Sequence, residues 1–140
     1  MKISFIGVKD TQVSIFKDLS KKLSSKISGL ILEERFVNDI FDIPFVALES
    51  SEDSDFIIVF STFDQENVEV VNLVKSKLID VELKTKVRII KNFVEDEFSS
   101  AVEGEFYELK DKLVEDFSSK IISILFNEID FEPKDVEFGI

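Results

Sequence analysis

The segment Phe56-Ile57-Ile58-Val59-Phe60 is apolar at five consecutive positions. An acidic connection at residues 51–55 precedes it, and a polar segment at 61–66 follows it. A continuous apolar run of this length is typical of a strand that is covered on both faces, as the strands of parallel sheets are. We therefore expect this segment to be a central strand of a parallel sheet, with helices on both faces.

Three further segments have the pattern of strands, and they differ in charge. Residues 3–8 are almost entirely apolar, whereas 30–37 and 87–92 each contain charged residues. Charged strands are tolerated more easily at the edges of a sheet. Because helical periodicity separates the strands, the crossovers should be right-handed and the strands parallel. These patterns predict a three-layer α/β fold with a four-stranded parallel sheet in the order 2-1-3-4. The expected helices are one capped by Thr11 and running to about residue 25, then 44–50, 68–83 and 106–124.

The composition of the 140-residue chain restricts both its class and its chemistry. Its length and its 44% apolar content fit one domain, residues 1–140, with one core. The net charge of −12 argues against nucleic acid and anionic membranes as partners, and we expect a cytoplasmic protein without a membrane span. With neither histidine nor cysteine, serine-triad, cysteine-protease and His-zinc chemistries are excluded.

Acidic residues gather in the four loops that should follow the strands. Ligands of such folds bind outside the carboxyl ends of the strands, at the point where the strand order reverses. The carboxylates there either cap helix N-termini or form a site for a hard cation or a polyhydroxyl ligand. Both interpretations stay open. The acids are Asp10, then Asp39 and Asp42, then Asp64 and Glu66, and finally Glu95, Asp96 and Glu97.

Aromatic and apolar residues near these loops suggest further contacts. Phe41 and Phe63 lie in the loops, and Phe93 follows the fourth strand. Each ring either packs into the core or offers a stacking surface for a flat heterocycle. The segment 68–83 is apolar on more than one helical flank, which indicates either a subunit interface or an unusually large contact within the chain.

Three short motifs suggest a family. They are Ile6-Gly7-Val8-Lys9-Asp10-Thr11, Val37-Asn38-Asp39-Ile40-Phe41-Asp42-Ile43-Pro44 and Phe93-Val94-Glu95-Asp96-Glu97. The first is similar to the opening strand and turn of archaeal-type riboflavin synthases, and the second resembles the Val-Pro-Gly-x-x-Asp-(Leu/Ile)-Pro loop that these enzymes share with lumazine synthases. The third resembles the segment after their fourth strand. The resemblance spans almost the whole chain and implies a flavodoxin-like, lumazine-synthase-like fold.

The resemblance also implies an activity and an assembly. In this family a transferase of riboflavin biosynthesis converts two molecules of 6,7-dimethyl-8-ribityllumazine into riboflavin and a ribitylaminopyrimidine, with Mg²⁺ assisting. The family forms homopentamers with ligand sites between neighbouring subunits. Carried over to this chain, the substrate-binding residues are expected to be Asp10, Thr11, Ile40, Phe41, Asp42, Thr62, Phe63 and Asp64, with Phe93 and Lys112 reaching in from a neighbouring subunit.

Two alternative functions remain open at this point. The third loop, residues 61–66, contains neither a glycine nor a basic residue. A non-catalytic oligomer of the same fold, which binds a flavin- or pteridine-like ligand or none, is therefore one alternative. The other is a receiver-like signalling domain, in which acidic loops support Mg²⁺-dependent phosphoryl transfer to Asp64. Such a domain needs a lysine near the site, and Lys91 is the residue closest to that place in the sequence.

Overall fold

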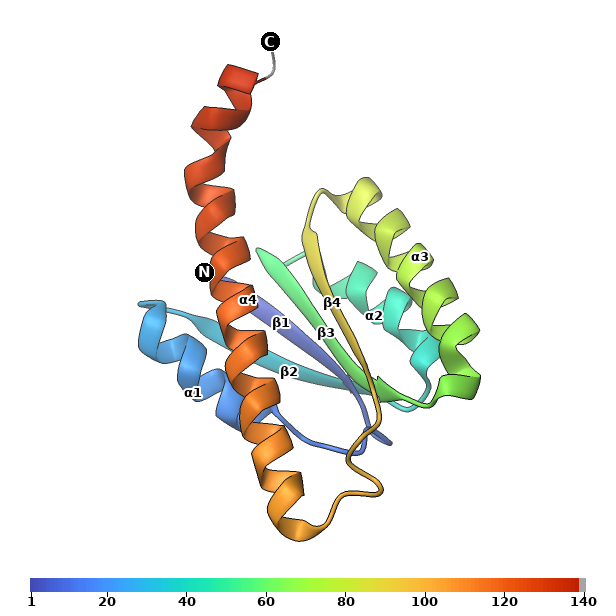
Figure 1. Ribbon diagram of the computed structural model, residues 1–140. Helices are drawn as coiled ribbons and strands as arrows, with labels where there is room; N and C mark the ends of the chain where they lie inside the picture. Colours follow the sequence, from blue (N-terminus) through green and yellow to red (C-terminus); the bar gives the residue numbers. More distant parts are fainter. Residues whose placement is uncertain (139–140) are drawn as a thin grey trace.

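The computed structural model describes the backbone of residues 1–138 and the side chains of residues 1–126. Its centre is a four-stranded parallel sheet in the order β2-β1-β3-β4, which confirms the predicted fold and strand order (Figure 1). The strands are β1 (Lys2–Val8), β2 (Ile31–Val37), β3 (Phe56–Phe63) and β4 (Arg88–Glu95). The helices are α1 (Phe16–Lys26), α2 (Ile43–Ser50), α3 (Val68–Thr85) and α4 (Glu103–Phe138), with short 3-10 turns η1 (Ile40–Asp42) and η2 (Gln65–Asn67).

Helices cover both faces of the sheet, and β3 contributes to the core on each side. Helices α1 and α4 lie on one face, and α2 and α3 lie on the other (Figure 1). Ile58 and Phe60 point toward α1 and α4, whereas Ile57 and Val59 point toward α2 and α3, and all are at most 2% exposed. The apolar run is therefore a strand buried on both faces, as the sequence predicts.

The charged strands lie at the two edges of the sheet, and most of their charges have partners. On β4, the ammonium group of Lys91 pairs with the carboxylate of Glu82 from α3. The same carboxylate accepts a 2.9 Å hydrogen bond from the backbone N–H of Ile89. On β2, Glu33 pairs with Arg35 at 3.1 Å. Partnered charges can be half-buried at a sheet edge without a large desolvation cost.

Several predicted boundaries were wrong, and the reasons are local. Helix α1 begins at Phe16 rather than after Thr11, because the backbone N–H of Thr11 donates to the carbonyl of Val8 at 3.1 Å and closes a turn. The following segment buries Val13 and Ile15 against the core before the helix starts. Helix α4 is also longer than predicted at both ends.

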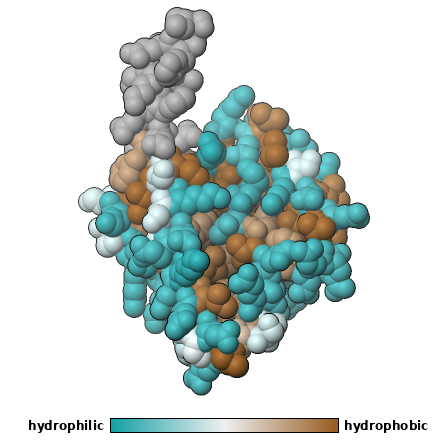
Figure 2. Space-filling model, viewed as in Figure 1, coloured by the Kyte–Doolittle hydropathy of each residue, from teal (hydrophilic) through white to brown (hydrophobic). Residues whose placement is uncertain are grey.

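Strands β3 and β4 extend three residues beyond their predicted ends. Ser61 pairs with Phe93, and Phe63 pairs with Glu95, in register with the rest of the ladder. Phe93 therefore belongs to a strand and not to a loop, and the third and fourth loops are shorter than the sequence suggests. None of the described helices combines the length and the hydropathy that crossing a bilayer requires. The visible surface is mostly hydrophilic, with separate apolar patches (Figure 2).

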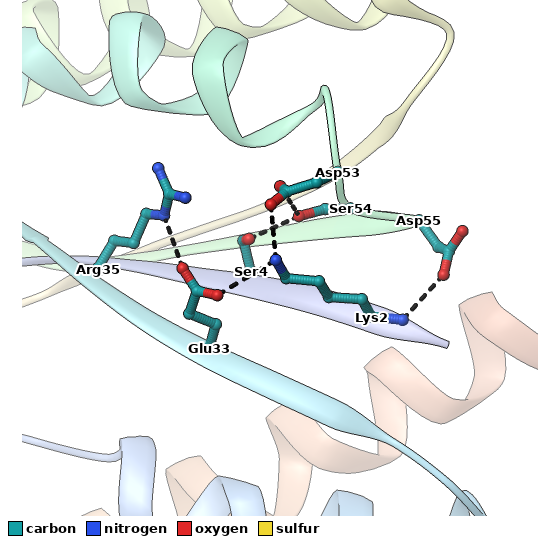
Figure 3. Close-up of polar contacts among 7 residues, drawn as sticks. All are labelled: Lys2, Ser4, Glu33, Arg35, Asp53, Ser54 and Asp55. Carbon is teal, nitrogen blue, oxygen red and sulfur yellow. Dashed lines mark hydrogen bonds and ion pairs between the residues drawn. The ribbon is translucent and has the colours of Figure 1, made fainter.

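A polar network lies at the amino-terminal end of the sheet (Figure 3). The ammonium group of Lys2 lies 2.7 Å from a carboxylate oxygen of Asp53 and 3.2 Å from one of Glu33. The backbone N–H of Lys2 donates to Asp55 at 2.8 Å. Beneath it the buried hydroxyls of Ser4 and Ser54 are 2.6 Å apart. The network joins β1, β2 and the loop before β3, at the end of the sheet opposite to the predicted functional loops.

The network makes the stability of the fold sensitive to acid. Hydrogen bonds from Lys2 hold the pKa of Asp53 below its ordinary value, and hydrogen bonds from Lys2 and Arg35 do the same for the pKa of Glu33. Because both pKa values are lower in the folded state, these carboxylates stabilise the fold above their unfolded pKa of about 4. That contribution is lost as the pH falls through the folded values.

We expect the double variant Glu33→Gln, Asp53→Asn to lose less stability between pH 7 and pH 3 than the unmodified chain. Its unfolding free energy at pH 7 should already be lower, because the ion pairs with Lys2 are gone. Urea denaturation at a series of pH values measures both effects. Glu49→Gln alters an exposed carboxyl on α2 that pairs with no charge among the described residues, so it should keep the full acid dependence. Identical pH profiles for all three proteins would contradict this account.

Truncation within β3 should be far more costly than the same truncation at the sheet edge. Ile58 is fully buried, whereas Ile31, the first residue of the edge strand β2, is 61% exposed. Ile58→Ala should lower the unfolding free energy by about 2–5 kcal/mol, because it removes buried methylene groups and leaves a cavity. Ile31→Ala should change it by about 0.5 kcal/mol or less. Chemical denaturation monitored by circular dichroism compares the two.

Candidate functional site

A cavity of about 500 Å³ lies at the carboxyl ends of the strands, where the loops after all four strands meet. Seven of the ten residues that the sequence predicts as substrate-binding line it: Asp10, Thr11, Ile40, Phe41, Thr62, Phe63 and Asp64. The other lining residues are Val8, Gln12, Asn38, Asp39, Ser61, Asn67, Val70 and Asp96. The cavity therefore combines hydroxyl, amide and carboxylate groups with apolar walls.

The first loop is tied to the end of β3 on one side of the cavity. The backbone N–H of Gln12 donates to the hydroxyl oxygen of Thr62 at 3.1 Å. The hydroxyls of Thr11 and Ser61 are 3.5 Å apart, and Ser61 Oγ also donates to the carbonyl of Thr62 at 2.9 Å. These bonds hold the β1 and β3 loops together at the reversal of the strand order, where open α/β sheets bind ligands.

The second loop is shaped by Asp39, whose carboxylate caps the 3-10 turn η1. Asp39 Oδ1 accepts a 2.9 Å hydrogen bond from the backbone N–H of Phe41, and its carbonyl accepts another of 2.9 Å from Asp42. The turn leaves Phe41 53% exposed at the cavity and Ile40 half-buried beside it. Asp39 is therefore a capping residue, which is one of the two roles expected for the loop acids.

Asp96 has a similar structural role in the fourth loop. Its carboxylate accepts hydrogen bonds from the backbone N–H of Phe98 at 2.8 Å, from that of Ser99 at 3.1 Å, and from the Ser99 hydroxyl. Although burial raises the pKa of Asp96, these hydrogen bonds outweigh it and hold that pKa below its ordinary value. Its stabilising effect is thus present above about pH 4 and is lost on acidification.

Asp10 and Asp64 differ from these capping acids. Both are exposed, both line the cavity, and in the described part of the chain neither carboxylate has a hydrogen-bond or ion-pair partner. The side-chain amides of Asn38 and Asn67 are equally free. Among the described residues, no lysine or arginine lines the cavity. The site therefore offers hydrogen-bond acceptors and a negative potential, which favour neutral hydroxylated or cationic ligands over anions.

The donor set does not form a site for a resident metal ion. Among residues 1–126, no three acidic side chains come close enough together to hold one. Asp39 and Asp96 are also committed to backbone N–H groups. Within residues 1–126 the carboxylates therefore form no dedicated cage for the Mg²⁺ that the family resemblance implies, and any Mg²⁺ held there would depend on water and ligand oxygens for most of its coordination.

Three of the predicted residues lie outside the cavity. Asp42, the last residue of η1, is exposed and is not part of the lining. The ring of Phe93 is only 9% exposed, packs in the core between the sheet and α3, and has the ammonium group of Lys75 5.9 Å from its centroid. Lys112 is exposed on α4, beside a separate groove of about 230 Å³ between α4 and the end of β4.

The sequence prediction missed Gln12, Asn67 and Val70. All three follow a predicted loop residue by a few positions and come into the cavity because the chain turns there, through the first-loop turn and through η2. Amide side chains in loops are a weak indication of a binding site, since they also stabilise turns by hydrogen bonds to the backbone. The position of the two amides, Gln12 and Asn67, directly after acidic loops is the only indication of them in the sequence.

The sequence matches no model of a known protein family, and it matches no curated protein.

The two kinds of cavity acid should respond differently to truncation. Asp96→Ala should lower the unfolding free energy by about 1–2 kcal/mol, because it leaves two backbone N–H groups of the fourth loop without their acceptor. Asp64→Ala should change it by about 0.5 kcal/mol or less, because no partner is lost. Urea denaturation at pH 7 distinguishes them, and equal losses would mean that Asp64 also has a structural role.

Proposed function

We propose that this chain is a riboflavin-synthase-like protein whose cavity binds 6,7-dimethyl-8-ribityllumazine. The observation that carries the proposal is the lining of the cavity, which joins aromatic walls to free carboxylates and contains no cation among the described residues. The proposal also draws on the three sequence motifs, each of which supplies cavity residues, Asp10, Phe41 and Asp96 among them.

A neutral ribityl heterocycle suits this lining in two respects. The flat ring can lie against the apolar wall of Ile40, Phe41 and Phe63, where stacking contributes modestly to affinity. The hydroxyl groups of a ribityl chain are donors, and charge-assisted hydrogen bonds to carboxylates such as Asp10 and Asp64 are about twice as strong as neutral ones. A phosphorylated ligand would meet only negative charge at these positions.

In the proposed reaction, the main task of the protein is to position the two substrate molecules. A four-carbon unit passes between two lumazine molecules, and the 7-methyl group of the lumazine is already acidic. Holding both heterocycles in register can therefore supply much of the rate, because orientation replaces an unfavourable encounter. The family resemblance also implies a ring of subunits. In such a ring, the exposed Lys112 of a neighbouring subunit would complete the site. Phe93 is buried in its own chain, so we assign it no role at a neighbour's cavity.

A second candidate is a non-catalytic protein that binds the same class of ligand. One observation favours it: the lining contains no basic side chain among the described residues, and the third loop contributes only Ser61, Thr62, Phe63 and Asp64 to it. The receiver-like alternative has less support. Lys91 lies in the middle of β4 and pairs with Glu82 of α3, away from the cavity.

A turnover and binding experiment tests the proposal. Purified protein incubated with 6,7-dimethyl-8-ribityllumazine, with and without added Mg²⁺, should produce a compound with the absorption of riboflavin. Binding without product would favour the non-catalytic candidate. Neither binding nor product, with a folded protein, would overturn the proposal. Incorporation of phosphate from acetyl phosphate at Asp64 would instead support the receiver-like alternative.

Variants locate the ligand within the cavity. Phe41→Ala and Asp64→Asn should each weaken lumazine binding about tenfold, which corresponds to about 1.4 kcal/mol, since each removes one direct contact. Asp42→Asn is the matched control, because it alters an exposed carboxyl of the same loop region outside the lining. Titration followed by lumazine fluorescence measures all three. Weakening by Asp42→Asn alone would move the site away from the cavity.

A further inference from the structure

We infer that the outer face of α3 pairs with α3 of a second copy of the chain, in antiparallel orientation about a two-fold axis. Five uncharged residues recur along this face at spacings of four, four, three and four: Val68, Asn72, Ser76, Ile79 and Leu83. Residues with these spacings fall on one face of a helix. All five are exposed, and Ile79 and Leu83 are 47% and 67% exposed.

The stripe is separate from the face that α3 presents to its own chain. Val71, Val74 and Leu78 are buried against the sheet on the opposite side of the helix. Helix α3 therefore has apolar side chains on two faces, with Val68, Ile79 and Leu83 on the outer one, and only the inner face is covered within the chain. Apolar patches are visible among hydrophilic residues on the α3 side of the molecule (Figure 2). Because a third of the whole chain is charged, an uncharged stripe of this length on an exposed helix favours a contact with another helix.

The charges at the two ends of the stripe indicate its partner. Glu66 and Glu69 lie at its start, whereas Lys84 and Lys86 lie at its end. All four are exposed, and none has an ion-pair partner in the described part of the chain. In an antiparallel pair, the acidic start of one α3 meets the basic end of the other at both ends of the contact. A parallel pair would bring like charges together, which is unfavourable.

The outer face of α3 is thus complementary to the same face of a second copy in the antiparallel orientation, as a two-fold contact requires. Antiparallel pairing also aligns the helix dipoles favourably. The stripe covers fifteen residue steps, from 68 to 83, and is therefore about 22 Å long. A contact between two helices of this length buries less than the roughly 1,200 Å² of a standard interface, so we expect a weak association, in the micromolar range or above.

Because the contact is two-fold, it doubles whatever unit the chain otherwise forms. A monomer would become a dimer, and the ring considered under the proposed function would become a pair of rings. The inference therefore stands apart from the ligand and from the ring. Its tests use the particle mass, while lumazine binding by the same samples reports on the cavity separately.

Breaking the stripe should halve the particle mass. Ile79→Glu places a charge within the contact twice, once from each copy. It should abolish the association in sedimentation equilibrium at about 100 µM, where a weak pair is populated. Val102→Glu is the matched control, since Val102 is 64% exposed in the loop before α4. It should keep the mass of the unmodified chain. Circular dichroism and lumazine titration should be unchanged in both.

Charge reversal tests the orientation. Glu69→Lys and Lys84→Glu should each raise the dissociation constant about tenfold, because each replaces two attractive contacts with two repulsive ones. The double variant with both changes should recover the original constant. Lys21→Glu, on the exposed side of α1, controls for the change in net charge.

Three results would overturn the inference. One is an unmodified chain whose mass at high concentration equals that of Ile79→Glu. Another is a dissociation constant that Glu69→Lys leaves unchanged, because in a parallel pair the substitution only replaces one like-charge contact with another. The third is a double variant that stays as weak as the single ones. A stripe that binds a different protein or a lipid surface would give the first of these results.

Discussion

The burial of β3 on both of its faces is the constraint on which the rest of the structure depends. Side chains of this strand alternate between two separate cores, so helices must cover both sides of the sheet. Helical crossovers supply this cover and join the strands in parallel, and parallel strands bring all their carboxyl ends to one end of the sheet. The cavity lies at that end because the loops after all four strands meet there.

Much of the fold could be predicted from the sequence, because it depends on properties that residues carry individually. The uninterrupted apolar run identified β3, and the charges in β2 and β4 placed these strands at the edges. The ends of β3 and β4 were not predictable in this way. Ser61 and Thr62 have the composition of a loop, yet their backbones continue the ladder opposite Phe93 and Val94. Strand ends depend on the partner strand, which a local pattern does not contain.

The location of the candidate site could be predicted from the sequence, but the roles of its individual residues could not. The topology brought most of the predicted residues to one cavity, since loops after parallel strands share an edge. Which carboxylates are free was decided by individual backbone N–H groups: the carboxylates of Asp39 and Asp96 accept hydrogen bonds from them, whereas that of Asp64 accepts none from the described residues. Acids of both kinds have the same appearance in a sequence. Phe93 was misplaced for the same reason that the end of β4 was, since one register position separates a loop ring from a core ring.

The polar network around Lys2 lies at the opposite end of the sheet from the cavity, and this distance has an evolutionary consequence. The interactions that secure the strands at their amino ends share no residue with the cavity lining. Substitutions in the loops at the carboxyl ends can therefore change the cavity without weakening the network. In a chain built this way, the residues of the cavity can change while the strand order of the sheet is kept. The sheet therefore preserves the architecture longer than the loops preserve the chemistry.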